Sequence, residues 1–153
     1  MFGESRQPLT LRVVNTLYVE AMVLADEARA CFDQPTGGSR NTLAPLVRVR
    51  LSCESLKVTT RLMHIVAWLL TQRAAAATIT GGGASARLGR AAESDVSSLD
   101  GMPEDARKII IASTDLYERI QRLDARFQAP LPSLGARTLQ NRLNYAMDGV
   151  PTG

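Results

Sequence analysis

Residues that commonly carry catalysis or bind metal ions are scarce in this sequence. The 153 residues include one histidine, His64, and two cysteines, Cys31 and Cys53. The cysteines lack the C-x-x-C spacing of zinc and redox sites, and both lie inside apolar helical patterns, so we expect buried, reduced thiols. His64 has no acid or nucleophile at a suitable helical offset, which favours a partly exposed surface histidine over a catalytic one. We therefore predict a protein that is not an enzyme and that holds no metal.

The sequence also contains no convincing motif for a nucleotide cofactor. Residues 81–86 match the pattern G-x-G-x-x-A, but they follow a predicted helix, whereas a dinucleotide site needs a strand before the glycines. The Gly-Lys-Ser/Thr run of a phosphate-binding loop does not occur in the sequence. We expect no cofactor.

Long hydrophobic runs are also missing. The longest nearly apolar run, residues 62–70, contains His64 and is far shorter than the roughly 20 residues that a membrane-spanning helix needs. Residues 1–8 are polar, unlike the start of a signal peptide. We therefore expect a cytoplasmic protein that does not enter a membrane.

The sequence does contain three segments with helical periodicity and none with the strict alternation of a strand. They cover about residues 10–32, 43–77 and 103–127, and proline or glycine residues separate them. An all-α antiparallel three-helix bundle within residues 1–130, with a long second helix, is the simplest way to bury their apolar stripes.

Two segments lie outside these helices. Residues 78–101 are rich in glycine, alanine and serine, and we predict a flexible linker before the third helix. Residues 131–153 are predicted to be a flexible, mostly disordered tail. The tail contains one short amphipathic turn, around Leu139, Leu143 and Met147.

The second predicted helix has two neighbouring apolar stripes, which together cover about half of its circumference, more than the stripe of roughly 100° that a surface helix needs. Two helical neighbours would explain both stripes, but a surface that is buried only by a dimer or by cargo would explain the second equally well. Ile110 and Tyr117 lie off the seam of the third helix and favour the latter explanation. The candidate surface for a dimer or for cargo therefore consists of Leu56, Met63, Val66, Leu70, Ile110 and Tyr117.

The remaining arc of this helix is basic and ends at the only tryptophan of the chain. Residues 43–77 contain five basic residues against one acidic residue, Glu54. Because Arg and Trp often dominate the binding energy of interfaces, we predict a contact face for an acidic partner. An equally weighted alternative is that Trp68 covers a loop or an edge of the bundle, and charge stripes alone are usually only solvated. The predicted contact residues are Arg50, Lys57, Arg61, His64 and Trp68.

The sequence of the second helix resembles a known family. Residues 54–74, ESLKVTTRLMHIVAWLLTQRA, resemble the signature helix of the RcdA family, the alphaproteobacterial regulators of CtrA degradation. Residues 17–29, LYVEAMVLADEAR, and residues 113–126, STDLYERIQRLDAR, are similar to the same family. The resemblance spans all three predicted helices but neither the glycine-rich linker nor the tail.

This resemblance implies a dimeric three-helix bundle that acts as a non-enzymatic proteolytic adaptor. Such an adaptor tethers cell-cycle and developmental regulators to the ClpXP protease once ClpX has been primed by a response-regulator adaptor. It also engages a cyclic-di-GMP-binding partner and is recruited to a cell pole. The resemblance implies no catalytic, metal or nucleotide site.

Two other classes of function remain open at this stage. A basic helix within three helices is compatible with a nucleic-acid-binding transcriptional regulator. However, both this helix and the turn before the third helix are too long for a helix-turn-helix. A purely structural dimerisation module would have a buried interface and no third protein. We expect no nucleic-acid partner.

Overall fold

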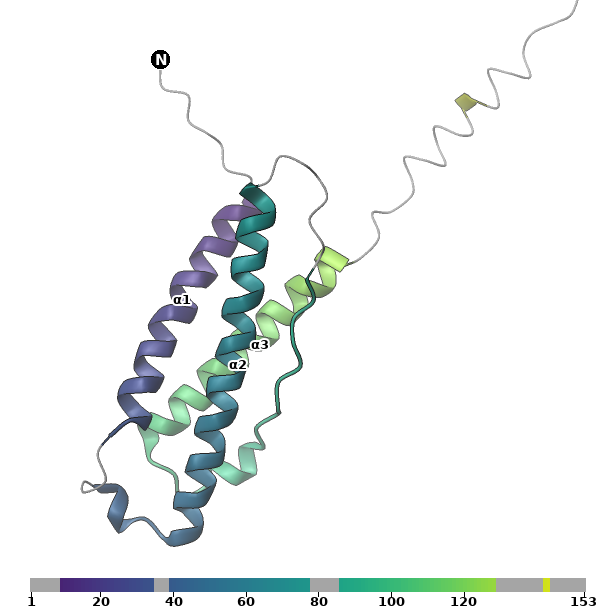
Figure 1. Ribbon diagram of the computed structural model, residues 1–153. Coiled ribbons are helices and arrows are strands. Elements are labelled where there is room, and N and C mark those ends of the chain that lie inside the picture. Colours follow the sequence, from purple (N-terminus) through teal and green to yellow (C-terminus); the bar gives the residue numbers. More distant parts are fainter. Residues whose placement is uncertain (1–8, 35–38, 78–85, 129–141, 144–153) are drawn as a thin grey trace, which may run out of the picture.

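Three α-helices pack side by side in the computed structural model, which describes residues 9–34, 39–77, 86–128 and 142–143. The helices are α1 (Leu9–Phe32), α2 (Pro45–Ala77) and α3 (Glu104–Gln128). In Figure 1, α1 and α2 run antiparallel along their length, and α3 crosses behind them at an oblique angle. The described part of the chain has no strand. The predicted all-α three-helix bundle with a long second helix is confirmed, and each predicted helix agrees with the observed one to within about two residues.

The ends of the helices follow from local chemistry. Pro45 is the first residue of α2, a position at which the missing N–H costs nothing and the fixed φ favours a helix. Glu104 and Asp105 occupy the first turn of α3, where the helix dipole is positive. Gly101 precedes α3 with a φ of 81°, a conformation that side chains other than glycine rarely adopt.

The core lies where the apolar stripes of the three helices meet. One of the two apolar stripes of α2 is buried there, together with the seams of α1 and α3. This stripe consists of Leu51, Val58, Leu62, Ile65 and Leu69. The buried apolar residues are Val14, Leu17, Ala21, Leu24, Ala28, Cys31, Leu51, Val58, Leu62, Ile65, Trp68, Leu69, Leu99, Met102, Ala106, Ile109, Ile110, Leu116 and Ile120.

The segment between α2 and α3 differs from the predicted flexible linker over its described residues. Residues 86–95, which we call the strap, run along α2 and α3 (Figure 1) and lead into a short 3₁₀ helix, η2 (Val96–Leu99). The strap is held by hydrogen bonds to side chains of α2 and α3, and Leu99 of η2 is buried in the core. The prediction of a flexible linker is therefore wrong for residues 86–101. The rest of the predicted linker, residues 78–85, lies outside the described residues.

Most of the predicted tail also lies outside the described residues, including Leu139 and Met147. Only Arg142 and Leu143 are described there; both are helical, and Leu143 is 62% exposed. Over the described residues, no helix combines the length and the apolar character that crossing a membrane requires.

Candidate protein-binding surfaces

The basic arc of α2 is largely covered. Arg61 and Trp68 are each only 2% exposed, while Lys57 and His64 are half-buried. Arg50 alone among the five predicted contact residues is exposed. The strap and α3 cover this arc, so the prediction of an open contact face is wrong for Arg61 and Trp68.

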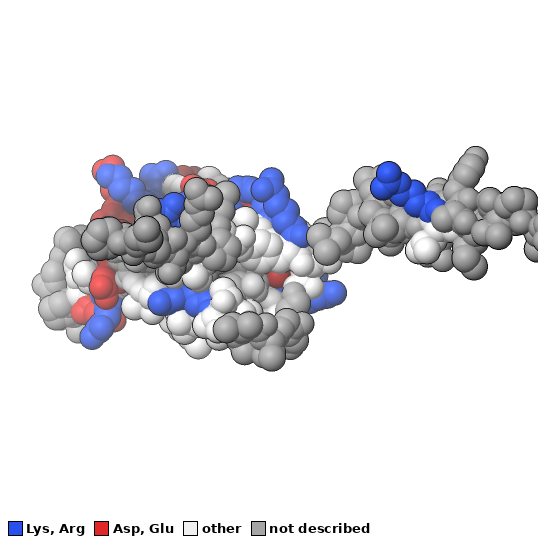
Figure 2. Space-filling view, turned by 90° about the horizontal axis from the view of Figure 1, so that it is seen from above, with Lys and Arg blue, Asp and Glu red and all other residues white. Residues whose placement is uncertain are grey.

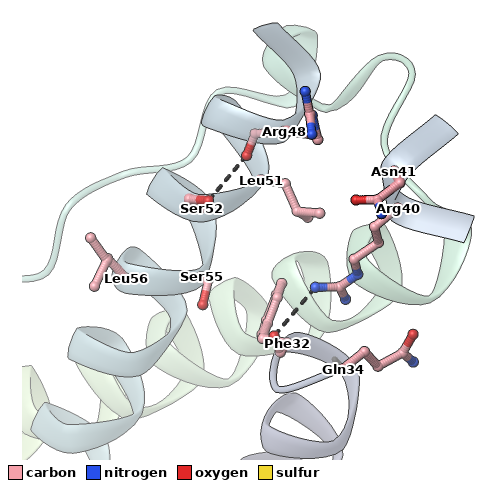
Figure 3. Close-up of a pocket in the computed structure, with 9 residues that line it drawn as sticks. All are labelled: Phe32, Gln34, Arg40, Asn41, Arg48, Leu51, Ser52, Ser55 and Leu56. Atoms are coloured by element: carbon pink, nitrogen blue, oxygen red, sulfur yellow. Dashed lines mark hydrogen bonds between the residues drawn. The ribbon is translucent and has the colours of Figure 1, made fainter. Parts of the chain in front are cut away.

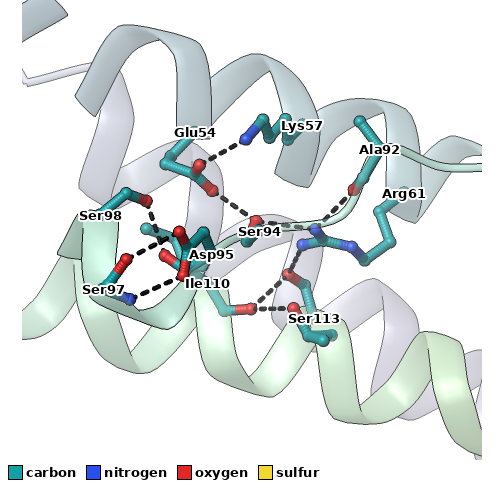
Figure 4. A network of polar contacts seen from close by, with 11 residues as sticks. Glu54, Lys57, Arg61, Ala92, Ser94, Asp95, Ser97, Ser98, Ile110 and Ser113 are labelled. Carbon is teal, nitrogen blue, oxygen red and sulfur yellow. Dashed lines mark hydrogen bonds and ion pairs between the residues drawn. The ribbon is translucent and has the colours of Figure 1, made fainter. Parts of the chain in front are cut away.

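Arg61 is the centre of a buried polar network between α2, α3 and the strap (Figure 4). Its Nη1 donates to Oγ of Ser113 on α3 at 2.7 Å. Its Nη2 donates to the carbonyl oxygen of Ala92 at 3.1 Å and to Oγ of Ser94 at 2.9 Å. The guanidinium therefore binds the strap to both helices.

Glu54 supplies the negative charge of this network. Its side chain is buried, and it accepts hydrogen bonds from Nζ of Lys57 at 2.8 Å and from Oγ of Ser94. Burial lowers the pKa of Arg61 from its ordinary value, while the charge of Glu54 and, to a smaller extent, Tyr117 act in the opposite direction. The ion pair of this network joins Glu54 to Lys57, whereas Arg61 and Glu54 are linked through Oγ of Ser94. These hydrogen bonds compensate the buried charges for the loss of water.

Trp68 lies under the end of α3. Its Nε1 donates to Oδ1 of Asp124 at 2.9 Å, and its ring stacks on Phe127 with the ring centroids 5.7 Å apart. Oδ2 of Asp124 accepts from the backbone N–H of Leu88 at 3.1 Å, so one carboxylate joins Trp68 to the strap. Trp68 is therefore a buried residue packed against α3 and joined to the strap, which favours the structural explanation of this tryptophan over the contact face.

His64 packs closely against the strap. A methyl group added at Gly89 would overlap the imidazole ring, so the glycine permits a close approach that no other residue would allow. Tyr117 fixes the same part of the strap, because its hydroxyl donates to the carbonyl oxygen of Gly89 at 2.7 Å and accepts from the N–H of Ala91 at 3.2 Å.

The predicted apolar surface separates into two groups. Leu56, Met63 and Leu70 on α2 are 69%, 67% and 46% exposed, so the second apolar stripe of α2 does face outward in the single chain. Val66, on the same stripe, is half-buried.

The two residues of α3 do not belong to this surface. Ile110 is 1% exposed because it packs in the core, and the half-buried Tyr117 faces the strap. The prediction that they add to an outward apolar surface is wrong, since the strap covers that side of α3.

A groove of about 580 Å³ runs between α1 and α2 beside the exposed stripe. Leu62 and Ala28 are buried at its base, while Met63 and Leu70 remain exposed along it. The lining is mostly apolar, with Arg29, Asp33, Ser55 and Thr59 as its polar members. An apolar groove between two helices is a common binding site for a further amphipathic helix.

A second hollow, of about 500 Å³, lies where α1 turns into α2 (Figure 3). One of its two arginines, Arg40, donates to the carbonyl oxygens of Cys31 and Phe32 at the end of α1. A basic side chain at the last carbonyls of a helix stabilises the helix end. Arg40 therefore has a structural role in closing the turn between α1 and α2.

Charged side chains do not gather on one face of the bundle in the view of Figure 2, where basic and acidic residues lie near each other on several sides. Within the described residues, no group of His, Cys, Asp and Glu side chains could hold a metal ion. The cysteines differ from the prediction, because Cys31 is buried but Cys53 is exposed.

Comparison with known proteins identifies the family. A family model described as "Protein of unknown function (DUF1465)" matches residues 5–147. The chain belongs to this family. No curated protein and no solved structure is significantly similar to it.

Several structural residues of this family member were missed in the sequence. Ser113 lies on the seam of α3 between Ile109 and Leu116, and a polar residue on an apolar seam is a sign of a buried hydrogen-bonding partner. Asp124 and Ser94 gave no such signal, because their positions alone do not indicate what they contact.

Proposed function

We propose that this protein is a non-enzymatic adaptor that delivers regulator proteins to the ClpXP protease. The observation that carries the proposal is the resemblance of residues 54–74 to the signature helix of the RcdA family. Those residues form most of α2, and similar segments fall on α1 and α3. The family match over residues 5–147 is compatible with one common architecture for the whole chain.

The exposed stripe of α2 supports a role in protein binding. Leu56, Met63 and Leu70 place three large apolar side chains on the surface of one helix. Exposed apolar patches of this kind often mark interaction sites. We assign this stripe to contact with cargo or with a second copy of the chain, in place of the basic arc that the strap covers.

An adaptor of this type acts through effective concentration. When the adaptor holds a cargo at the protease, binding of the cargo to the protease becomes an intramolecular step. The overall affinity of the cargo for the protease can then increase by roughly 10²–10⁴-fold without new contacts. The adaptor needs two binding surfaces and no reactive group. The proposed partners are ClpX primed by a response-regulator adaptor, the cargo regulators and a cyclic-di-GMP-binding protein, and the proposed location is the cytoplasm with recruitment to a cell pole.

Degradation with purified components tests the proposal. The chain should accelerate proteolysis of cargo, first captured from native cells by a ClpXP variant that traps its substrates without cleaving them. Leu56→Asp should lower that acceleration by at least about tenfold, which corresponds to about 1.4 kcal/mol of binding free energy. Val96→Asp is the matched control, because Val96 is 73% exposed but lies on η2, outside the exposed stripe of α2.

The other two classes of function predict different results. A structural dimerisation module would self-associate in sedimentation experiments but would not change the rate of proteolysis. A nucleic-acid-binding regulator would bind DNA with an affinity that falls steeply as salt increases. Either result, together with unchanged proteolysis, would overturn the adaptor proposal.

A further inference from the structure

The groove between α1 and α2 continues into the hollow where α1 turns into α2. Phe32 of α1 and Ser55 of α2 line both. The exposed apolar stripe follows them along their length, since Leu56 lines the hollow while Met63 and Leu70 line the groove. We call the hollow and the groove together the long groove.

The long groove has the length and the spacing that suit one further helix. Between Arg48, which lines the hollow, and Leu70, α2 rises by about 33 Å, or about six turns. Leu56, Met63 and Leu70 recur every seven residues, the spacing at which side chains of one helix line up along a second helix. A helix laid along them would remove their exposed apolar surface from water.

The hollow end of the long groove is positively charged. Arg40 and Arg48 line it, and Figure 3 shows both on the side away from Leu56. Among the described residues, no carboxylate forms an ion pair with either arginine. The other charged residues of the long groove, Arg29 and Asp33, form an ion pair with each other at 3.9 Å. The lining therefore carries a net charge of +2, from three arginines and one aspartate.

Arg48 is the more available of the two cations. Arg40 donates hydrogen bonds to the last carbonyls of α1, which use part of its guanidinium. The side chain of Arg48 is exposed and has no hydrogen-bond or ion-pair partner within the part of the chain that the structure describes. It lies in the first turn of α2, where the helix dipole is also positive.

We infer that the long groove binds an amphipathic helix of a cargo protein, and that this helix carries carboxylates at the end that meets Arg48 and Arg40. Its apolar face lies along Leu56, Met63 and Leu70. Apolar burial supplies most of the affinity, while the charges fix the direction in which the helix lies. The inference rests on the proposed adaptor function, because it takes the helix to belong to a cargo.

α2 of a second copy does not have this chemistry. Its single acidic residue, Glu54, is buried in the polar network. A closed two-fold pairing places the same surface on both sides of the interface. In such a pairing through α2, each copy would offer Arg48 but no accessible carboxylate of α2 to the other.

Two synthetic peptides test the inference with the full chain. Both are about 22 residues long, are held helical by a hydrocarbon staple and have leucines at three- and four-residue steps. One carries glutamates at one end, and the other carries lysines at the same positions. In fluorescence anisotropy, the glutamate peptide should bind at least about tenfold more tightly, because the lysines would meet Arg40 and Arg48.

Variants of the chain locate the binding site. Arg48→Glu should remove the preference for the glutamate peptide, and Met63→Asp should weaken binding of both peptides by at least about tenfold. Arg50→Glu is the matched control for charge, because Arg50 is exposed on α2 but lines neither the hollow nor the groove. Val96→Asp is the control for the apolar change, and both controls should bind like the original chain. Leu56→Asp replaces Met63→Asp if circular dichroism shows that the latter unfolds.

Equal affinity for the two peptides, or a preference that survives Arg48→Glu, would overturn the inference. Self-association in sedimentation that Met63→Asp abolishes and that the glutamate peptide does not reverse would also overturn it, because the long groove would then hold a second copy.

The degradation assay separates this inference from the adaptor proposal. If the original chain and Arg48→Glu accelerate cargo proteolysis equally, the inference fails and the adaptor proposal stands. If the original chain does not accelerate proteolysis, the adaptor proposal fails, while the peptide measurements still decide whether the long groove takes an acidic helix.

Discussion

Nη1 of Arg61 on α2 lies 2.7 Å from Oγ of Ser113 on α3, and both side chains are buried. The hydroxyl of Ser113 in turn donates to the backbone carbonyl of Ile110 at 2.9 Å. A charged group is retained in the core because the strap and α3 satisfy its donors, and the nearby carboxylate of Glu54 balances its charge. This contact holds the Arg61 side of α2 against α3 and the strap.

Removal of Arg61 should strongly destabilise the fold. Arg61→Met leaves the buried carboxylate of Glu54 without its guanidinium neighbour, and the strap loses two hydrogen bonds. Each buried polar group that loses its hydrogen-bond partner costs about 1–3 kcal/mol of unfolding free energy. Urea unfolding followed by circular dichroism measures the change. Arg50→Met, at an exposed position of the same arc, should stay within about 0.5 kcal/mol. Equal stability of the two variants would show that Arg61 does not hold the strap.

Asp124→Ala should both destabilise the protein and change the environment of Trp68. The substitution removes the acceptor of the indole N–H and of the Leu88 N–H. A buried donor left without a partner costs about 1–3 kcal/mol. Because Trp68 is the only tryptophan, the emission maximum reports on this site directly, and we expect it to move to longer wavelength. The exposed Asp115→Ala on α3 serves as the control, and an identical emission spectrum in both variants would refute the prediction.

Gly89→Ala tests the close packing of the strap on His64. The added methyl group overlaps the imidazole, so the strap or the ring has to shift, at a cost of about 1–3 kcal/mol in unfolding free energy. In a His64→Ala background the same change should cost much less, because the overlapping ring is gone. Thermal unfolding of the four proteins in this double-mutant cycle gives the coupling energy. A coupling energy of zero would mean that the two residues do not touch in solution.

The carboxyl group of Asp95, just before η2, should titrate below the ordinary pH range of an aspartate. Hydrogen bonds from the hydroxyl and the backbone N–H of Ser97 lower the pKa of Asp95. Since the folded pKa is below the unfolded one, the stabilisation is present above the ordinary pKa of about 3.9 and is lost as the pH falls through the folded pKa. Ser97→Ala should raise the pKa of Asp95 toward its ordinary value. Carboxyl titration by NMR measures both, and an unchanged midpoint in the variant would contradict this assignment.

The two cysteines should differ in their reactivity toward thiol reagents. Burial raises the pKa of the Cys31 thiol, and the hydrogen bond to Asp105 adds to the increase. Cys53 is exposed. Because the thiolate is the reactive form, Cys53 should react at least about tenfold faster than Cys31 in the folded protein. Single-cysteine variants, Cys31→Ser and Cys53→Ser, separate the two rates, which should converge in denaturant. Equal rates in the folded protein would contradict the burial of Cys31.

The sequence alone was sufficient to predict the three helices. Hydrophobic residues spaced by three and four, with Pro45, Pro103 and the glycines between segments, specify where helices begin and end, because these signals act over a few residues. The apolar stripe containing Leu56, Met63 and Leu70 was also recognised in the sequence, but its spacing left open whether a neighbouring helix would bury it, and the structure shows that it is exposed.

The tertiary structure decided which arc of α2 is covered. Spacing along a helix shows on which side of α2 Arg61 and Trp68 lie. It does not show which other segment of the chain packs against that side. The strap covers them, and its composition gave no sign of this, because its order comes from Tyr117 and Asp124 rather than from a periodic pattern of its own. Those partners lie far along the chain, so the contacts exist only once α2 and α3 have packed together. The local spacing of residues therefore determines where the helices form. The burial of the basic arc of α2 depends on contacts that exist only in the assembled fold.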